Sequence, residues 1–217
     1  EPLRGTEDEA ATEEIYGKRV FDAMGGVTQR VSEKQALADG LDELEARFAG
    51  KRINGMTAHR RENFGEGMEN IAAAVQRLAA RDDVAIIFPV HLNPNVRAVM
   101  NARLAGLDNV ALIEPLDYPH FARLLDISHL MLTDSGGVQE EAPALGKPVL
   151  VMRETTERPE GIAAGTAKLV GTDPDAIVRE TTRLLDDEAA YAAMARAHNP
   201  FGDGHSAARI ADLLAEA

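Results

Sequence analysis

Short runs of hydrophobic residues alternate with amphipathic stretches over most of the chain. Apolar runs without polar alternation are typical of strands that are buried on both faces. They predict strands at residues 52–58, 84–90, 109–114, 129–133, 148–152 and 168–170. Apolar residues spaced three and four apart predict helices at residues 68–81, 94–105, 118–126, 137–145, 174–186, 188–197 and 205–216.

Regular alternation of strands and helices favours an α/β fold with a doubly wound parallel sheet, because parallel strands need crossover connections. We therefore expect a Rossmann-like sheet of five or six strands. The dipeptide Asn54-Gly55 conflicts with this pattern, since Asn-Gly is a turn signal inside the first predicted strand. We expect that strand to be short and irregular, or that edge of the sheet to be disturbed.

The first 50 residues differ from the rest. Residues 1–16 form a polar, acidic tail, and apolar spacing over residues 17–50 predicts two amphipathic helices with a break near Gly25-Gly26 and Ser32. We expect residues 1–50 to be a tail and helical segment, and residues 51–217 to be one domain. The chain starts at Glu1 without a methionine, so we expect it to be part of a longer protein.

The charge balance and the lack of cysteine argue against several classes of function for this protein. Acidic residues outnumber basic ones 36 to 23, giving a net charge of −13, which disfavours nucleic acid and anionic membranes as partners. The absence of cysteine excludes disulfides and thiolate metal sites, and it fits a cytoplasmic protein. The six histidines lack metal-ligand spacing, so we expect neither a metal nor a cofactor.

The most informative loop follows the predicted strand at 129–133. Ligands of open α/β sheets bind outside the carboxyl ends of the strands. There, Ser135 can cap the next helix, and Gly136 and Gly137 leave backbone N–H groups open to phosphate oxygens. Glu141, one turn further on, is suited to a ribose diol. The residues fit a nucleoside diphosphate, and they fit a capped turn with a solvent-facing glutamate equally well.

Three further loops carry candidate residues at strand ends. His59 and Arg60 place an imidazole and a guanidinium together, which fits phosphate binding or a salt-bridged surface loop. Arg158 can reach the same phosphate, or neutralise Glu154 or Glu157. His91 ends another strand. Phe121 can cover a base, although an ordinary core position is the favoured alternative.

Several motifs together resemble the family of non-hydrolysing UDP-N-acetylglucosamine 2-epimerases. The matching segments occur in the order of the family and cover residues 52–216. They are HRRENFGEG (59–67), PVHLNPN (89–95), LIEPL (112–116), LTDSGGVQEEAPALGKP (132–148), TTERPEG (155–161), GTAKLVGTD (165–173) and AHNPFGDG (197–204). Two departures are the interruption at Asn54-Gly55 and the absence of the family's N-terminal domain. In addition, Lys18-Arg19 stands where the family usually has an Asn-Thr pair.

The resemblance implies the C-terminal, UDP-binding half of a two-domain enzyme with a glycosyltransferase-B-like fold. By position it assigns a catalytic histidine (His59), UDP contacts (Ser135, Gly136, Gly137, Glu141, Arg158, Phe121 and Leu116) and a possible regulatory pocket for UDP-N-acetylglucosamine (Arg60 and His91). It further implies a homodimeric, cytoplasmic isomerase that acts on UDP-N-acetylhexosamines, with its catalytic carboxylates in the other half. The alternatives are a stand-alone or non-catalytic sugar-nucleotide-binding domain, and the C-terminal domain of a glycosyltransferase.

Overall fold

Six parallel strands form the centre of the protein in a computed structural model that describes residues 39–202 and 205–215. Their order across the sheet is β3-β2-β1-β4-β5-β6. The strands are β1 (Arg52–Thr57), β2 (Val84–Pro89), β3 (Val110–Ile113), β4 (Leu130–Thr133), β5 (Val149–Val151) and β6 (Ala167–Leu169). This is the Rossmann strand order, in which the chain reverses its direction of winding between β1 and β4.

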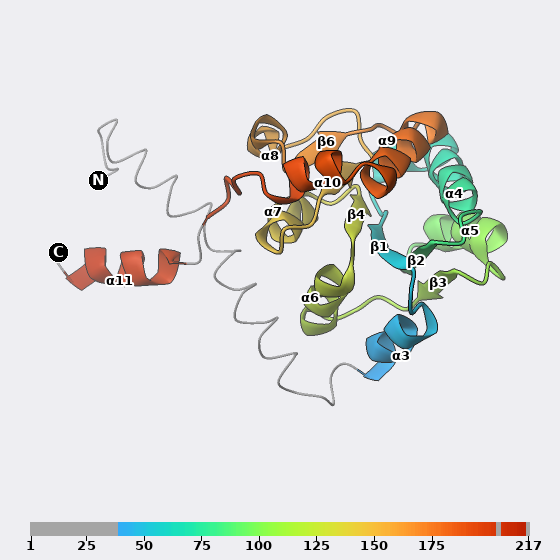
Figure 1. Ribbon diagram of the computed structural model, residues 1–217, viewed down its shortest axis with the longest axis horizontal. Helices are drawn as coiled ribbons and strands as arrows, with labels where there is room; N and C mark the ends of the chain where they lie inside the picture. Colours follow the sequence, from blue (N-terminus) through green and yellow to red (C-terminus); the bar gives the residue numbers. More distant parts are fainter. Residues whose placement is uncertain (1–38, 203–204, 216–217) are drawn as a thin grey trace.

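Helices cover both faces of the sheet, as Figure 1 shows for α4 and α5 on one side and α6 and α7 on the other. The helices of the described part are α3 (Asp39–Arg47), α4 (Glu66–Leu78), α5 (Pro94–Leu104), α6 (Tyr118–Ile127), α7 (Gly136–Ala144), α8 (Pro159–Ala164), α9 (Pro174–Asp186), α10 (Glu188–Ala195) and α11 (Ser206–Ala215), with a 3-10 turn, η2 (Arg61–Asn63). The predicted α/β fold is therefore confirmed. The acidic tail and the first predicted N-terminal helix lie outside the described residues.

The core is divided by the sheet into layers that follow the alternation of side chains along each strand. On one face, α4, α5 and α9 pack against residues such as Met56, Ile86 and Leu132. On the other, α3 and α6 pack on Ile53 and Ile87. Because α3 contributes buried side chains to this core, the packed unit begins before the boundary that we expected near residue 50.

The expected irregularity of the first strand is wrong. β1 is a regular six-residue strand at the centre of the sheet, paired with β2 on one side and β4 on the other. A glycine is needed at position 55 because there is no room for a side chain: a Cβ there would overlap the sulfur of Met131 on β4 and stand 2.7 Å from Oγ of Ser128, just before that strand. The dipeptide Asn54-Gly55 therefore does not form a turn; its glycine marks a close contact between neighbouring strands.

Asn54 remains a local weakness of β1. Its side chain is fully buried, and neither its amide nitrogen nor its carbonyl oxygen has a hydrogen-bond partner. An unsatisfied buried polar group costs about 1–3 kcal/mol. We expect Asn54→Val to raise the free energy of unfolding by about 1–3 kcal/mol, measured by urea denaturation.

Asn63 offers a matched control for this substitution. It is also buried, but its amide donates to Asp134 Oδ2 and to the carbonyl of Met152, both at 3.2 Å. The same change, Asn63→Val, should therefore lower stability. An unfolding midpoint for Asn54→Val at lower urea than the parent chain would contradict the assignment.

Candidate functional site

A cavity of about 270 Å³ opens at the carboxyl ends of β1 to β4, where the winding of the sheet reverses. This crevice is the usual ligand site of doubly wound sheets. Its lining comes from four strand-to-helix loops and the helices that follow them: Thr57, Ala58, His59, Pro89, His91, Pro115, Leu116, Phe121, Ser135, Gly137, Val138 and Glu141. The structure thus brings together seven of the residues singled out from the sequence: His59, His91, Leu116, Phe121, Ser135, Gly137 and Glu141.

The beginning of α7 forms one wall of this cavity. Ser135 occupies the N-cap position, but its hydroxyl makes no capping hydrogen bond, contrary to the expected cap. The N–H groups of the first helical turn have no partner within the helix. A Cβ on Gly137 would meet only Ser135 Oγ, at 3.9 Å, so the space beside Gly137 is open, whereas the N–H of Ser135 already donates to Thr133 Oγ1 at 2.9 Å. The geometry suits an anion at this helix end.

Arg60 stands beside the same helix end. A Cβ on Gly136 would lie 3.7 Å from Nη2 of Arg60, and Nε of Arg60 donates to the carbonyl of Asp134 at 3.3 Å. Its guanidinium also lies 3.8 Å from Glu157. Arg60 was assigned by resemblance to a regulatory pocket, and the structure places it next to the glycines expected to bind diphosphate.

Asp134 is a site residue that the sequence analysis missed. Its carboxylate is fully buried and accepts hydrogen bonds from the backbone N–H groups of His59 and Arg60, at 2.9 and 2.8 Å, and from Asn63. Nδ1 of His59 lies 3.1 Å from Oδ1. Burial by itself would raise the pKa of Asp134, but the hydrogen bonds from His59 and Arg60 outweigh it and hold the pKa below its ordinary value.

The two histidines of the cavity contact each other. The rings of His59 and His91 are stacked, with centroids 5.7 Å apart and an interplanar angle of 23°. Nδ1 of His91 accepts from the backbone N–H of Asn93 at 3.1 Å. His91, which the resemblance placed in a separate regulatory pocket, therefore lines the same cavity as the residues expected to bind UDP.

Glu141 brings an unusual carboxyl group to the cavity. Burial, and secondly the neighbouring charge of Glu140, raise the pKa of Glu141 to about 7. Its carboxyl group is thus poised between its neutral and charged forms near neutral pH. A ligand that donates hydrogen bonds to Glu141 would favour the charged form.

The raised pKa of Glu141 makes stability depend on pH. Between the ordinary value of 4.5 and about 7, the folded chain holds more protons at this group than the unfolded chain, so stability falls as pH rises through this window. Relative to Glu141→Gln, we expect the free energy of unfolding of the parent chain to fall by at most about 3 kcal/mol from pH 4.5 to pH 7. Parallel pH profiles for the two proteins, measured by urea denaturation, would contradict this pKa.

Three predicted residues, Arg60, Gly136 and Arg158, do not line the cavity, and Arg158 is held by an acidic residue of α7. Nε of Arg158 forms an ion pair with Glu140 on α7, and Nη1 donates to the carbonyl of Glu157 at 3.0 Å. Neither of the expected carboxylates, Glu154 and Glu157, is its ion-pair partner. Glu140 precedes Glu141 on the same helix, so this ion pair holds Arg158 next to a residue of the cavity.

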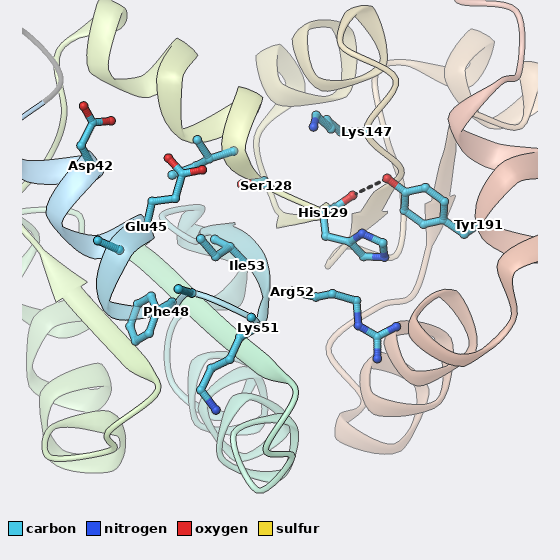
Figure 2. Close-up of a pocket in the computed structure, with 14 residues that line it drawn as sticks. Asp42, Glu45, Phe48, Lys51, Arg52, Ile53, Ser128, His129, Lys147 and Tyr191 are labelled. Atoms are coloured by element: carbon cyan, nitrogen blue, oxygen red, sulfur yellow. Dashed lines mark hydrogen bonds between the residues drawn. The ribbon is translucent and has the colours of Figure 1, made fainter. Parts of the chain in front are cut away.

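A larger cavity, of about 690 Å³, opens at the amino ends of β1 and β4 (Figure 2). Two of its cations donate to carbonyls in the last turns of helices: Arg52 to Leu185 of α9, and Lys147 to Asp126 of α6, at 2.7 Å. Tyr191 donates to the carbonyl of His129 at 3.0 Å. Cations at helix C-termini stabilise the helices. The cations of this larger cavity therefore have a structural role at helix ends. The smaller cavity is the better ligand site because it contains the open N-terminus of α7.

Two kinds of feature are absent from residues 39–202 and 205–215. No group of three or more histidine, cysteine, aspartate or glutamate residues could hold a metal ion there. No helix within that part is long and apolar enough to cross a membrane.

The strand order and the cavity at the point of reversal define a Rossmann-like α/β domain with a site suited to an anionic ligand. The sequence model of the family described as UDP-N-acetylglucosamine 2-epimerase matches residues 9–215. The chain belongs to the UDP-N-acetylglucosamine 2-epimerase family.

Curated relatives and solved structures agree with this family. The UDP-N-acetylglucosamine 2-epimerase of Salmonella typhimurium is 52% identical over 202 residues, covering 92% of this chain and 54% of the relative. A probable UDP-N-acetylglucosamine 2-epimerase of Ralstonia nicotianae is 55% identical over 198 residues, covering 90% and 53%. The crystal structure of the Neisseria meningitidis UDP-GlcNAc 2-epimerase bound to UDP-GlcNAc is 42% identical with a TM-score of 0.78, covering 91% and 53%. The chain spans about half the length of the relatives it matches.

Proposed function

We propose that this chain is the UDP-binding half of an isomerase that interconverts UDP-N-acetylglucosamine and UDP-N-acetylmannosamine. The observation that carries the proposal is the switch-point cavity, which joins an open helix N-terminus, the loop of His59 and the half-buried carboxyl group of Glu141. A relative solved with bound UDP-GlcNAc supports the choice of nucleotide.

Each part of UDP finds a matching group in the cavity. The backbone N–H groups of Gly136 and Gly137 receive the diphosphate, with Arg60 as a cationic neighbour and His59 beside them, whereas the N–H of Ser135 already donates to Thr133 Oγ1. Glu141, in its ionised form, accepts hydrogen bonds from the ribose diol.

The apolar side of the cavity provides the remaining contacts. Leu116 and Phe121 offer a surface for uracil. Arg158 would add a further phosphate contact if it exchanged its partner Glu140 for the ligand. His91 lines the same cavity and Arg60 lies beside Gly136, so a regulatory UDP-N-acetylglucosamine would lie next to the substrate.

The proposed reaction breaks the anomeric C–O bond, and the electron pair leaves with UDP. A base removes the C2 proton, which gives 2-acetamidoglucal; UDP then adds back, and a proton is delivered to the opposite face of C2. The task of this chain is to stabilise the charge that develops on UDP, by N–H groups and cations fixed in advance. His59 acts at the leaving phosphate. We assign the C2 base to the part of the relatives that this chain does not cover.

The test of the activity is hydrogen exchange at C2. The product of the complete reading frame is incubated with UDP-N-acetylglucosamine in deuterated water, and we expect deuterium at C2 together with the N-acetylmannosamine epimer. A glycosyltransferase would transfer the sugar without exchange at C2. A sugar-nucleotide sensor would bind UDP and leave the substrate unchanged. Either result would overturn the proposed activity. The homodimer implied by the resemblance stays a prediction, to be tested by sedimentation.

A further inference from the structure

We propose that Asp134 is a positioning residue that holds His59 in the tautomer protonated at Nδ1 and turns Nε2 toward the cavity. The inference rests on the proposed function only in naming a diphosphate as the group that Nε2 meets. The sequence pattern singles out His59 and assigns no role to Asp134.

The contact between the two side chains fixes the position of the ring proton. Oδ1 of Asp134 lies 3.1 Å from Nδ1 of His59. An ionised carboxylate can only accept a hydrogen bond, so Nδ1 must carry the proton. The pKa of Asp134 lies below its ordinary value, which keeps the carboxylate ionised. Nε2 is then the ring nitrogen left for a ligand, since His59 itself lines the cavity.

The two oxygens of Asp134 share the backbone N–H of His59 and otherwise have different partners. Oδ2 accepts from the backbone N–H groups of His59 and Arg60 and from the amide of Asn63, at 2.9, 2.8 and 3.2 Å. Oδ1 faces the imidazole, with the backbone N–H of His59 also at 3.1 Å. One oxygen therefore fixes the loop, while the other orients the ring. Stacking of His91 on the ring further restricts its rotation.

This arrangement decides how His59 can meet a phosphate. With Nδ1 protonated, a neutral ring presents the lone pair of Nε2, which repels phosphate oxygens. When Nε2 is protonated as well, the ring becomes a cation whose Nε2–H donates to phosphate. Asp134 then balances the positive charge from the Nδ1 side. Asp134 therefore makes His59 a charged donor to the leaving group, and a charged donor forms a stronger hydrogen bond than a neutral one.

The substitution Asp134→Asn separates orientation of the ring from fixation of the loop. The amide oxygen of asparagine can take the place of Oδ2 and keep its three N–H donors. The NH₂ group then faces Nδ1 of His59 and donates to it, so the ring must move its proton to Nε2. The change in tautomer is read by ¹⁵N NMR of histidine-labelled chain at alkaline pH, from which ring nitrogen carries the hydrogen.

We expect the Nδ1–H form of His59 in the parent chain and the Nε2–H form in Asp134→Asn. The control is Asn63→Ala, which removes a donor to Oδ2 but leaves Oδ1 in place, and should keep the Nδ1–H form. An Nε2–H ring in the parent chain, or an unchanged tautomer in a folded Asp134→Asn, would overturn the proposal. The parent spectrum decides even if Asp134→Asn does not fold.

Binding of UDP tests the ligand separately. Asp134→Asn should bind UDP about 10-fold more weakly, because a neutral donor replaces a charged one. If the tautomer changes as expected but the parent chain does not bind UDP, the positioning role of Asp134 stands and the proposed function falls. If UDP binds equally to both proteins although the tautomer changes, the charged-donor role of His59 is refuted.

Discussion

Replacing Gly137 by aspartate should abolish UDP binding and leave the fold intact. The new carboxylate would enter the space in which the diphosphate meets the N-terminus of α7, since Gly137 lines the cavity and nothing beyond Ser135 Oγ, at 3.9 Å, would meet its Cβ. Two unit charges about 4 Å apart at an effective dielectric constant of about 20 repel by about 4 kcal/mol. We therefore expect the affinity for UDP, measured by calorimetry, to fall by more than about 100-fold.

The matched control is Gly137→Asn, which has the same size without the charge. It should weaken UDP binding less than Gly137→Asp, and the difference between the two isolates the electrostatic part. An aspartate in the first turn of a helix is favourable by about 0.3–1 kcal/mol, so the melting temperature of Gly137→Asp should be unchanged or higher. A Gly137→Asp protein that binds UDP as tightly as the parent chain would refute the diphosphate site.

The substitution Glu141→Gln should make the protein insensitive to the ribose 2′-hydroxyl. In the parent chain, ionised Glu141 accepts hydrogen bonds from the diol, and a hydrogen bond to a charged group contributes about 1.5–3 kcal/mol. Above pH 7, we expect the parent chain to bind UDP about 10- to 100-fold more tightly than 2′-deoxy-UDP. Glu141→Gln should bind the two nucleotides with nearly equal affinity.

The pH dependence of this preference gives an internal check. The pKa of Glu141 is about 7, so its carboxyl group is protonated in acid and loses its advantage as an acceptor. The preference of the parent chain for UDP over 2′-deoxy-UDP should shrink as pH falls below 7, whereas the ratio for Glu141→Gln should stay flat. The comparison forms a double-mutant cycle between protein and ligand. If both proteins lose the same affinity for the deoxy nucleotide, Glu141 does not contact the ribose.

The fold could be predicted because its signals are local. Strands such as β2 are apolar on both faces, and each following helix carries its own spacing of apolar residues. The error at Asn54-Gly55 arose from a contact that is not local. Position 55 needs a glycine because Met131 and Ser128 leave no room for a side chain there. These two residues are more than 70 positions away in the chain. The sequence of residues 52–58 alone therefore could not have predicted that contact.

The site was predictable to the extent that it depends on one segment. Ser135, Gly137 and Glu141 belong to a single strand-to-helix junction, and the structure places all three in the cavity. Asp134 was missed because its partners are distant in sequence: His59 and Arg60 precede it by 75 and 74 residues. They meet only because β4 pairs with β1 rather than with the preceding strand β3.

Arg158 illustrates a different limit of sequence analysis. The topology brings the loop after β5 next to α7, as expected for neighbouring strands. Which carboxylate the guanidinium then pairs with depends on side-chain conformation, and the partner is Glu140. The raised pKa of Glu141 likewise depends on its burial among elements that are separate in the chain.

The central claim is that the N-terminus of α7 binds the diphosphate of UDP, and titration of the ¹⁵N-labelled chain with UDP tests it most directly. The amide resonances of Gly136 and Gly137 should shift with UDP, and should move little with uridine, which lacks phosphates. Spectra in which these two amides do not change at millimolar UDP would contradict the account.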